Sequence, residues 1–140
     1  MSRIFWDTNL FIYLMEDRGP LSSRTASLRT RMIERGDELY TSALTLGELL
    51  VKPLEADDDT LAEAYEAAVL EGTTVIPFDR RAAMEYARIR KDRTIRAPDA
   101  IQLACAATAG IDWFVTNDDR LSKKTIRGIH FVTSLERGPL

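Results

Sequence analysis

The sequence contains one histidine and one cysteine among its 140 residues. A zinc site built from imidazole and thiolate ligands needs several such side chains, so any bound metal must be held by oxygen atoms, which favours Mg²⁺ or Mn²⁺. The cysteine, Cys105, lies within the apolar stretch 101–107 and is interpreted as a small buried side chain. With one cysteine the chain forms no internal disulfide, as expected in a reducing cytoplasm.

A long uninterrupted apolar run is also missing, because Asp7 and Asn9 interrupt the apolar segment 4–15 and no small-residue cleavage site follows it. We therefore expect neither a signal peptide nor a membrane span. Internal repeats, linkers and low-complexity segments are not found either. With 140 residues and 45% apolar content, the chain is predicted to form one domain, residues 1–140, around one core.

An excess of positive charge is the third absence: 19 Lys and Arg residues stand against 22 Asp and Glu residues, a formal net charge of −3. The overall composition therefore does not indicate nucleic-acid binding. The charges are, however, separated along the chain. Segment 55–71 contains seven acidic and no basic residues, whereas segment 80–96 contains seven basic and two acidic residues. Such segments are usually solvated helix faces, and the alternative for the basic one is an anion-binding surface.

Hydrophobic periodicity and turn residues predict alternating strands and helices. The expected strands are 4–6, 38–41, 74–78, 113–115 and 129–132. The expected helices are 10–16, 22–36, 42–51, 60–72, 80–91 and 98–110. Their boundaries rest on Ser22 or Ser23 as a cap, Pro53 as a limit, Thr60 in a capping box and Asp79 as a cap. Strands separated by helices predict βαβ units and a mostly parallel sheet covered on both faces.

Four carboxylates lie where such a sheet would bring them together. Asp7 and Asp118 follow two of the expected strands, Asp99 opens a helix, and Glu48 lies in an early turn of another helix. Ligands of parallel sheets bind beyond the carboxyl ends of the strands, and helix starts lie at the same edge. The pattern therefore predicts that four oxygen donors converge there.

Asp7 is the hardest of the four to explain by structure alone. It follows the aromatic Trp6 at the end of a buried strand, where a carboxylate is unfavourable unless a cation or hydrogen bonds compensate for its burial. The alternative is that Asp7 caps the following helix, but Thr8 or Asn9 can serve in that position. Asp7 is therefore the first candidate for a functional residue.

The other three carboxylates each have an ordinary alternative explanation. Glu48 could form a capping box with Thr45. Asp99 could make a favourable contact with the helix dipole, and Asp118 with Asp119 could form a surface turn. These explanations stay open for each residue taken singly. A shared role rests on the predicted convergence of all four at one edge of the sheet.

The carboxylates lie in four short segments, Phe5–Asn9, Ser42–Leu49, Asp99–Ala104 and Val115–Leu121. In order and spacing these segments resemble the motifs of the PIN-domain ribonucleases, and within them the VapC toxins of toxin–antitoxin pairs. The resemblance implies an α/β fold, a three-layer α/β/α sandwich around a central, mostly parallel sheet of about five strands. It also implies a catalytic and metal-binding site for Mg²⁺ or Mn²⁺ made of Asp7, Glu48, Asp99 and Asp118, supported by Thr8, Asn9, Thr116 and Asn117, with Asp119 as the alternative to Asp118.

By this resemblance the chain is a metal-dependent endoribonuclease. One or two metals would bind the scissile phosphate, lower the pKa of a bound water from ~15.7 toward neutrality, and stabilise the departing 3′ oxygen. Such a mechanism needs no histidine, and the single histidine, His130, is assigned a structural role in the last strand. A mechanism that uses a pair of histidines is excluded by composition.

Basic residues near the predicted site are expected to bind the RNA backbone, because four carboxylates would otherwise repel it. Both basic segments are therefore predicted to flank the cleft. The residues are Arg81, Arg88 and Lys91 on one helical face, Arg93 and Arg96 before Asp99, and Lys123, Lys124 and Arg127 after Asp118.

The resemblance also implies protein partners. A small antitoxin would wrap its C-terminal segment around the nuclease and block the cleft, often with a basic residue against the carboxylates. A homodimer is expected as well. Its interface would use the apolar side chains of the first helix, or these side chains complete the core: Leu10, Phe11, Tyr13 and Leu14.

Three other interpretations remain. A haloacid-dehalogenase-type phosphatase also begins with an aspartate after its first strand, but it needs a second aspartate two residues on, where this chain has Asn9. A non-catalytic PIN-like binding module would have no use for an intact set of four carboxylates. A housekeeping PIN-domain nuclease for RNA processing would keep the chemistry without an antitoxin, and the small single domain favours the toxin instead.

Overall fold

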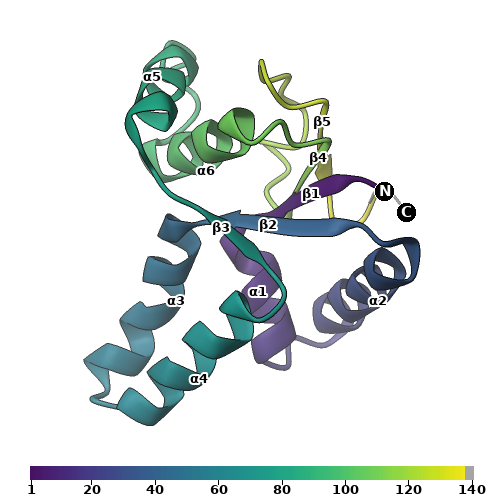
Figure 1. The fold of residues 1–140 in the computed structure, drawn as a ribbon, viewed down its shortest axis with the longest axis vertical. Coiled ribbons are helices and arrows are strands. Elements are labelled where there is room, and N and C mark those ends of the chain that lie inside the picture. Colours follow the sequence, from purple (N-terminus) through teal and green to yellow (C-terminus); the bar gives the residue numbers. More distant parts are fainter. Residues whose placement is uncertain (138–140) are drawn as a thin grey trace.

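Five parallel strands form one sheet, in the order β3-β2-β1-β4-β5 (Figure 1). The structure is a computed structural model and describes residues 1–137. The strands are β1 (Arg3–Trp6), β2 (Glu38–Ser42), β3 (Thr74–Ile76), β4 (Trp113–Thr116) and β5 (Phe131–Ser134). All strand pairings in this part of the chain are parallel, so the predicted sheet is confirmed.

Helices cover both faces of the sheet (Figure 1). The described residues form α1 (Thr8–Met15), α2 (Pro20–Arg35), α3 (Ala43–Glu55), α4 (Asp59–Leu70), α5 (Arg80–Ile89) and α6 (Ala97–Thr108). Helices α1 to α4 lie on one side of the sheet, and α5 and α6 lie on the other. Within residues 1–137, none of the helices is long and apolar enough to cross a membrane.

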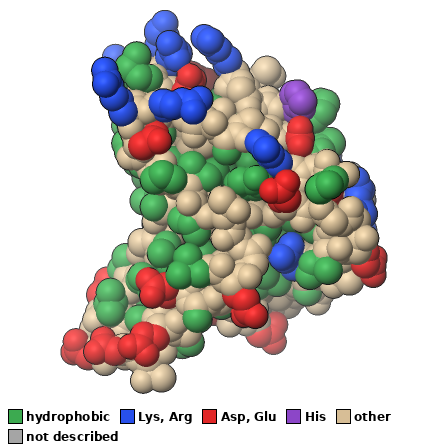
Figure 2. All heavy atoms as spheres, viewed as in Figure 1, with side chains coloured by type: hydrophobic (Ala, Val, Ile, Leu, Met, Phe, Trp, Pro, Cys, Tyr) green, Lys and Arg blue, Asp and Glu red, His purple; other side chains and the backbone are tan. Residues whose placement is uncertain are grey.

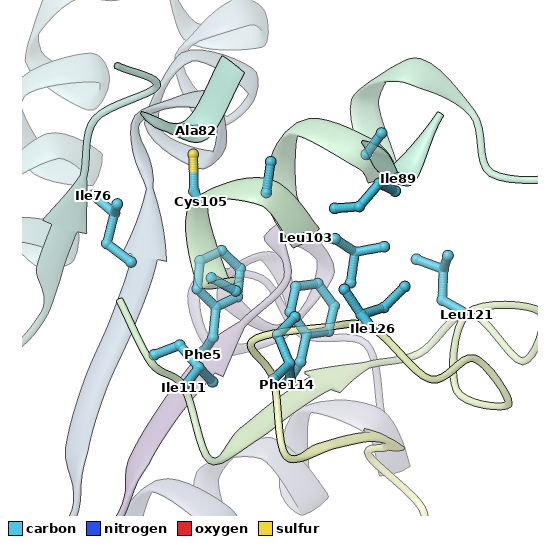
Figure 3. Close-up of a cluster of buried hydrophobic side chains, with 14 of the residues drawn as sticks. Phe5, Ile76, Ala82, Ile89, Leu103, Cys105, Ile111, Phe114, Leu121 and Ile126 are labelled. Atoms are coloured by element: carbon cyan, nitrogen blue, oxygen red, sulfur yellow. The ribbon is translucent and has the colours of Figure 1, made fainter. Parts of the chain in front are cut away.

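Alternation along β1 divides the apolar core between these two sides. Phe5 stacks on Phe114 with ring centroids 4.9 Å apart, and both lie in one cluster with Leu103 of α6 (Figure 3). Ile4 and Trp6 point the other way and pack against α1 to α4 in a second cluster. The expected three-layer α/β/α sandwich is thereby confirmed.

Two predicted helix starts are wrong. Helix α1 begins two residues earlier than expected, because Asp7 itself is the residue that caps it. Helix α2 begins at Pro20 after Gly19, and neither Ser22 nor Ser23 caps it. Proline is favourable in the first helical turn, where its missing N–H would have no intrahelical partner.

The turn between α3 and α4 also differs from the prediction. Helix α3 continues past Pro53, which lies in its last turn, so the missing N–H deletes one hydrogen bond, to the carbonyl of Leu49. The Pro53 side chain is buried, and its carbonyl accepts a hydrogen bond from the backbone N–H of Asp58. Asp58, rather than the predicted Thr60, caps α4 by accepting from the N–H of Leu61 at 3.0 Å.

The last strand starts two residues later than predicted, at Phe131, which pairs with Trp113. His130 therefore lies just before the strand; its side chain is exposed and its Nδ1 is 3.2 Å from Oδ1 of Asp112.

The prediction that Cys105 is a small buried side chain is confirmed. Its side chain is buried, and burial raises the pKa of the thiol to about 11.

Candidate metal centre

A cleft of about 370 Å³ opens at the carboxyl ends of β1 and β4, and all four predicted carboxylates line it. Asp7 follows β1, Asp118 follows β4, Glu48 comes from α3 and Asp99 from α6. The other lining residues are Thr8, Asn9, Ile12, Arg96, Pro98 and Gln102. Asp119 is exposed and does not line the cleft. The fold thus brings together side chains that are far apart in sequence.

Asp7 is the most buried of the four, with 9% of its surface exposed. Its Oδ1 accepts a hydrogen bond from the backbone N–H of Thr8 (2.8 Å), and its Oδ2 accepts one from the hydroxyl of Thr116 (2.9 Å). Burial raises the pKa of Asp7 to about 6; the two hydrogen bonds oppose this increase, and the carboxylates of Asp99 and Glu48 add to it. Asp7 caps α1 and still carries a charge that a cation would stabilise.

Glu48 is linked to Asp7 through Thr8. The hydroxyl of Thr8 donates to Oε1 of Glu48 at 2.6 Å, while the backbone N–H of Thr8 donates to Asp7. The capping-box explanation for Glu48 is wrong, because the residue before the first turn of α3 is Ser42, and Thr45 lies inside the helix. Glu48 is therefore held by a contact across the cleft rather than by its own helix.

Asp99 and Asp118 are each paired with an arginine. Nε of Arg96 is 3.7 Å from Oδ2 of Asp99, and Nη2 of Arg120 donates to Oδ2 of Asp118 at 3.2 Å. Burial raises the pKa of Asp99, against the opposing effect of Arg96, whereas the hydrogen bonds from Arg120 lower the pKa of Asp118. The arginine side chains are 67% and 66% exposed, so these ion pairs are weak and easily exchanged.

The donor set fits a hard divalent cation. Four carboxylates line the cleft and offer oxygen ligands of the kind that Mg²⁺ and Mn²⁺ prefer. Within residues 1–137, no three acidic side chains lie close enough to form a ready-made ligand cluster. A cation shared by Asp7, Asp99 and Asp118 would therefore require Asp99 and Asp118 to turn away from Arg96 and Arg120.

The predicted supporting residues fall into two groups. Thr8 and Thr116 both contact the carboxylates, and Thr116 Oγ1 also accepts a hydrogen bond from the backbone N–H of Asp118 at 3.1 Å. Asn9 lines the cleft. Asn117 differs from the expectation, because its amide donates to the hydroxyl of Tyr13 at 3.0 Å instead of to a carboxylate.

Sequence reasoning missed Gln102, which lies 2% exposed beneath the cleft. Its Nε2 donates to the hydroxyl oxygens of Thr8 (3.0 Å) and Thr45 (2.8 Å), and its Oε1 accepts from the hydroxyl of Ser42. The available signal was its spacing, because a residue three positions after Asp99 lies on the same helical face. Arg120 was missed as well, although it follows Asp118 by two residues.

Among the predicted RNA-binding residues, all within residues 1–137, Arg96 lines the carboxylate cleft. A second cavity, of about 280 Å³, lies where the two basic segments meet, and its walls include Arg88, Lys91, Lys124 and Arg127. Figure 2 shows Lys and Arg side chains gathered over the end of the molecule that contains α5, and Asp and Glu side chains over the end that contains the α3–α4 turn. Arg81, Arg93 and Lys123 are exposed.

Solved structures with this fold include toxin–antitoxin proteins. The chain matches one in a VapBC2 structure from Rickettsia felis bound to a promoter DNA fragment (TM-score 0.74, 14% identity, covering 94% of this chain and 98% of that chain). It also matches a chain of DNA-bound VapBC from Salmonella typhimurium (TM-score 0.73, 20% identity, 96% and 99%). A third match is to VapBC-5 from Mycobacterium tuberculosis, of the VapBC family of toxin–antitoxin systems (TM-score 0.62, 21% identity, 95% and 99%).

At these identities the solved structures establish a shared fold. No curated protein matches the chain in sequence. The model of the PIN domain family, by contrast, matches residues 4–126, a range that contains all four cleft carboxylates. The expected family is therefore confirmed: the chain belongs to the PIN domain family.

Proposed function

We propose that this protein is a metal-dependent endoribonuclease and the toxin of a toxin–antitoxin pair. The observation that carries the proposal is the cleft in which carboxylates from four elements meet, one of them buried at a raised pKa. A buried carboxylate such as Asp7 is unfavourable without compensation, and a carboxylate with a raised pKa in a cleft is typical of a functional site. A non-catalytic binding module would give no reason for this arrangement.

Asp7, Glu48, Asp99 and Asp118 would hold Mg²⁺ or Mn²⁺. When bound, such a cation supplies Lewis acidity, which activates water and stabilises negative charge on phosphate oxygens. The chain supplies orientation: Thr116 and Thr8 restrict the Asp7 carboxylate through hydrogen bonds to both of its oxygens. Because Asp7 is buried, water screens its own hydrogen bonds with Thr8 and Thr116 only weakly.

The arginines beside the cleft have a second use in this proposal. Arg96 and Arg120 neutralise Asp99 and Asp118 through exposed contacts, and both side chains can turn toward a substrate phosphate. Guanidinium groups bind phosphate oxygens in a bidentate manner, so after the exchange of carboxylate for phosphate each arginine would still be paired with an anion. A single strand of RNA would then continue over the second, basic cavity between α5 and segment 123–127.

An antitoxin partner is supported by an apolar groove next to the cleft. The groove, of about 550 Å³, lies between α1, α3 and α4, and its walls include Leu49, Leu61 and Tyr65. Ile12 and Glu48 line both the groove and the cleft, so a bound segment that fills the groove ends beside the carboxylates. A basic side chain at that end would compete with the metal.

The proposed homodimer must use fewer residues of α1 than the sequence suggested. Leu10 and Phe11 are buried in the core, whereas Leu14 is 42% exposed and available for an interface. Tyr13 is half-buried and accepts the hydrogen bond from Asn117. A cytoplasmic location completes the proposal.

The test is cleavage of labelled RNA by the purified protein with Mn²⁺ and with a chelator. Asp99→Asn should abolish Mn²⁺-dependent cleavage, while Asp59→Asn should retain it, although both residues lie in the first turn of a helix. Expression of the wild-type chain alone should arrest growth, and co-expression of the adjacent small reading frame should restore it. Cleavage without growth arrest would point to a housekeeping nuclease, and full activity of Asp99→Asn would refute the metal mechanism.

A further inference from the structure

Gln102 connects the segments that carry three of the four carboxylates. It lies on α6, one helical turn after Asp99, and it contacts Thr45 on α3, which carries Glu48. Its Nε2 also lies 3.0 Å from Thr8 Oγ1 and 3.4 Å from Oδ1 of Asp7. One buried amide of α6, the helix that carries Asp99, therefore contacts residues of the segments that carry Asp7 and Glu48.

The hydrogen bonds that link Ser42, Gln102, Thr8 and Glu48 can all have the same donor-to-acceptor direction. An ionised Glu48 carboxylate can accept hydrogen bonds but not donate them, so the single hydroxyl proton of Thr8 is committed to it. Thr8 Oγ1 must then accept from Gln102, which requires the amide NH₂ group on that side. The carbonyl of Gln102 consequently faces Ser42, whose hydroxyl donates to it. The chain runs from Ser42 through Gln102 and Thr8 to Glu48.

Simple packing does not explain an amide at this position. The neighbouring residues of α6, Leu103 and Ala104, are fully buried and apolar, and an apolar side chain in place of Gln102 would avoid the cost of burying an amide. With its NH₂ group on the side of Thr8 and Thr45, Gln102 offers these hydroxyls donors and no acceptor, so neither hydroxyl can direct its proton toward Gln102. A carboxylate that receives a fixed donor has fewer orientations available and is better prepared for a cation.

We propose that Gln102 is a positioning residue for the metal site: it keeps Thr8 as the hydrogen-bond donor to Glu48 and thereby sets the orientation of the Glu48 and Asp7 carboxylates. The inference rests on the proposed function, because it assumes that these carboxylates bind a divalent cation. It assigns Gln102 a role in cation affinity and no contact with the substrate.

The test measures Mn²⁺ binding to the metal-free protein by calorimetry. Gln102→Met keeps the length of the side chain without its donors, and Thr8→Val keeps the shape of threonine without its hydroxyl. Each should weaken Mn²⁺ binding about tenfold, the lower end of the effect of outer-shell partners. Because the two residues act in series, the double variant should lose about as much Mn²⁺ affinity as the more strongly affected single variant, about tenfold. Independent effects would instead multiply to a loss of about a hundredfold.

Matched variants control for packing. Leu103→Met introduces a methionine at the next position of α6, and Thr25→Val removes another buried hydroxyl, in α2; both should bind Mn²⁺ as the wild type does. Thr8→Ser retains the hydroxyl that Thr8→Val removes, so its Mn²⁺ affinity should lie within about twofold of that of the wild type. If either control is weakened as much as Gln102→Met, the effect is general packing and the inference is wrong.

Two failures can be told apart. A wild-type protein that binds no Mn²⁺ would refute the proposed metal site together with this inference. A wild-type protein that binds Mn²⁺ no better than Gln102→Met does, or multiplicative losses in the double variant, would refute the inference alone. If Gln102→Met does not fold, Ser42→Ala is the deciding variant. Ser42 makes no side-chain capping bond to α3, so its hydroxyl can be removed without weakening the helix start. Without that hydroxyl the Gln102 amide loses the donor to its carbonyl and is free to rotate. Unchanged Mn²⁺ affinity in Ser42→Ala would then refute it.

Discussion

The hydroxyl of Thr116, at the end of β4, donates a 2.9 Å hydrogen bond to Oδ2 of Asp7, at the end of β1. The contact ties the two central strands together at the edge where the cleft opens. It favours the ionised form of Asp7, yet burial outweighs it, and the pKa of Asp7 remains about 6. The metal-free protein is therefore less stable than its packing would allow.

The first prediction concerns the pH dependence of that stability. The pKa of Asp7 rises from 3.8 in the unfolded chain to about 6 in the folded protein, so the folded state binds the proton more tightly. Ionised Asp7 thus destabilises the fold by up to about 3 kcal/mol above pH 6, and this penalty disappears as the pH falls toward 4. Asp7→Asn should raise the free energy of unfolding at pH 8 and have little effect at pH 4.

Urea denaturation of the metal-free protein at pH 4, 6 and 8 measures this difference. Saturating Mn²⁺ at pH 8 should reverse the order, because it stabilises the wild type and not Asp7→Asn. A difference between the two proteins that is the same at pH 4 and pH 8 would contradict the assigned cause.

The second prediction distinguishes Asp118 from its neighbour Asp119. Asp118 lines the cleft and Asp119 points to solvent, although the two residues are adjacent and identical in chemistry. Asp118→Asn should reduce Mn²⁺-dependent RNA cleavage by on the order of 100-fold, because it removes a charged oxygen donor. Asp119→Asn should cleave at nearly the wild-type rate. Equal losses in both variants would mean that the turn moves when the site is loaded.

The third prediction concerns the basic cavity. Arg88 and Lys91 line it without lining the carboxylate cleft, so they should contribute to RNA affinity and not to the chemical step. In the double variant Arg88→Gln with Lys91→Gln, the slope of log affinity against log salt should fall by about 1.4, or about 0.7 for each lost phosphate contact on a single strand. Filter binding with an inactive Asp99→Asn background measures it.

The matched control for this prediction removes two charges from α2, Arg24→Gln with Arg31→Gln, on a different cavity of the surface. The control should leave the slope unchanged. If the slope is also unchanged in the Arg88 and Lys91 variant, these residues do not bind RNA phosphates and are ordinary solvated surface charges.

The fourth prediction uses two glycines with opposite expected effects on stability. Gly128 has φ +91°, and a Cβ there would lie 3.0 Å from the carbonyl oxygen of Ala107, so Gly128→Ala should destabilise the protein by about 1–3 kcal/mol. Gly47 lies inside α3 with open space around it, and Gly47→Ala should stabilise by about 0.5–1 kcal/mol. Thermal unfolding of both variants measures the difference, and two changes of the same sign would contradict this account.

Local chemistry explains which parts of the fold the sequence predicted. Gly36 ends α2 in the left-handed conformation, and Asp79 caps α5 by accepting from the N–H of Ala82, both as expected. These signals act over a few residues, so they can be recognised without the fold. Pro53 was misjudged because the rule that proline ends a helix fails in the last turn, where burial compensates for one lost hydrogen bond.

The site divides in the same way. The four carboxylates were brought to one cleft as predicted because each lies at the end of a strand or the start of a helix, and topology places those ends together. Gln102 was missed because its partners, Ser42 and Thr8, are 60 and 94 residues away in the sequence. Asn117 was misassigned because the orientation of an exposed amide depends on its nearest neighbour, here Tyr13.

The separation of charge along the chain has a consequence for how the protein would approach a polyanion. Acidic side chains gather over the end with the α3–α4 turn and basic side chains over the end with α5, so the molecule is an electric dipole with a small net charge (Figure 2). In the field of a polyanion it experiences a torque rather than a strong overall pull. The end with α5 would therefore lead when the molecule approaches a polyanion, and this orientation would be set before the two surfaces touch.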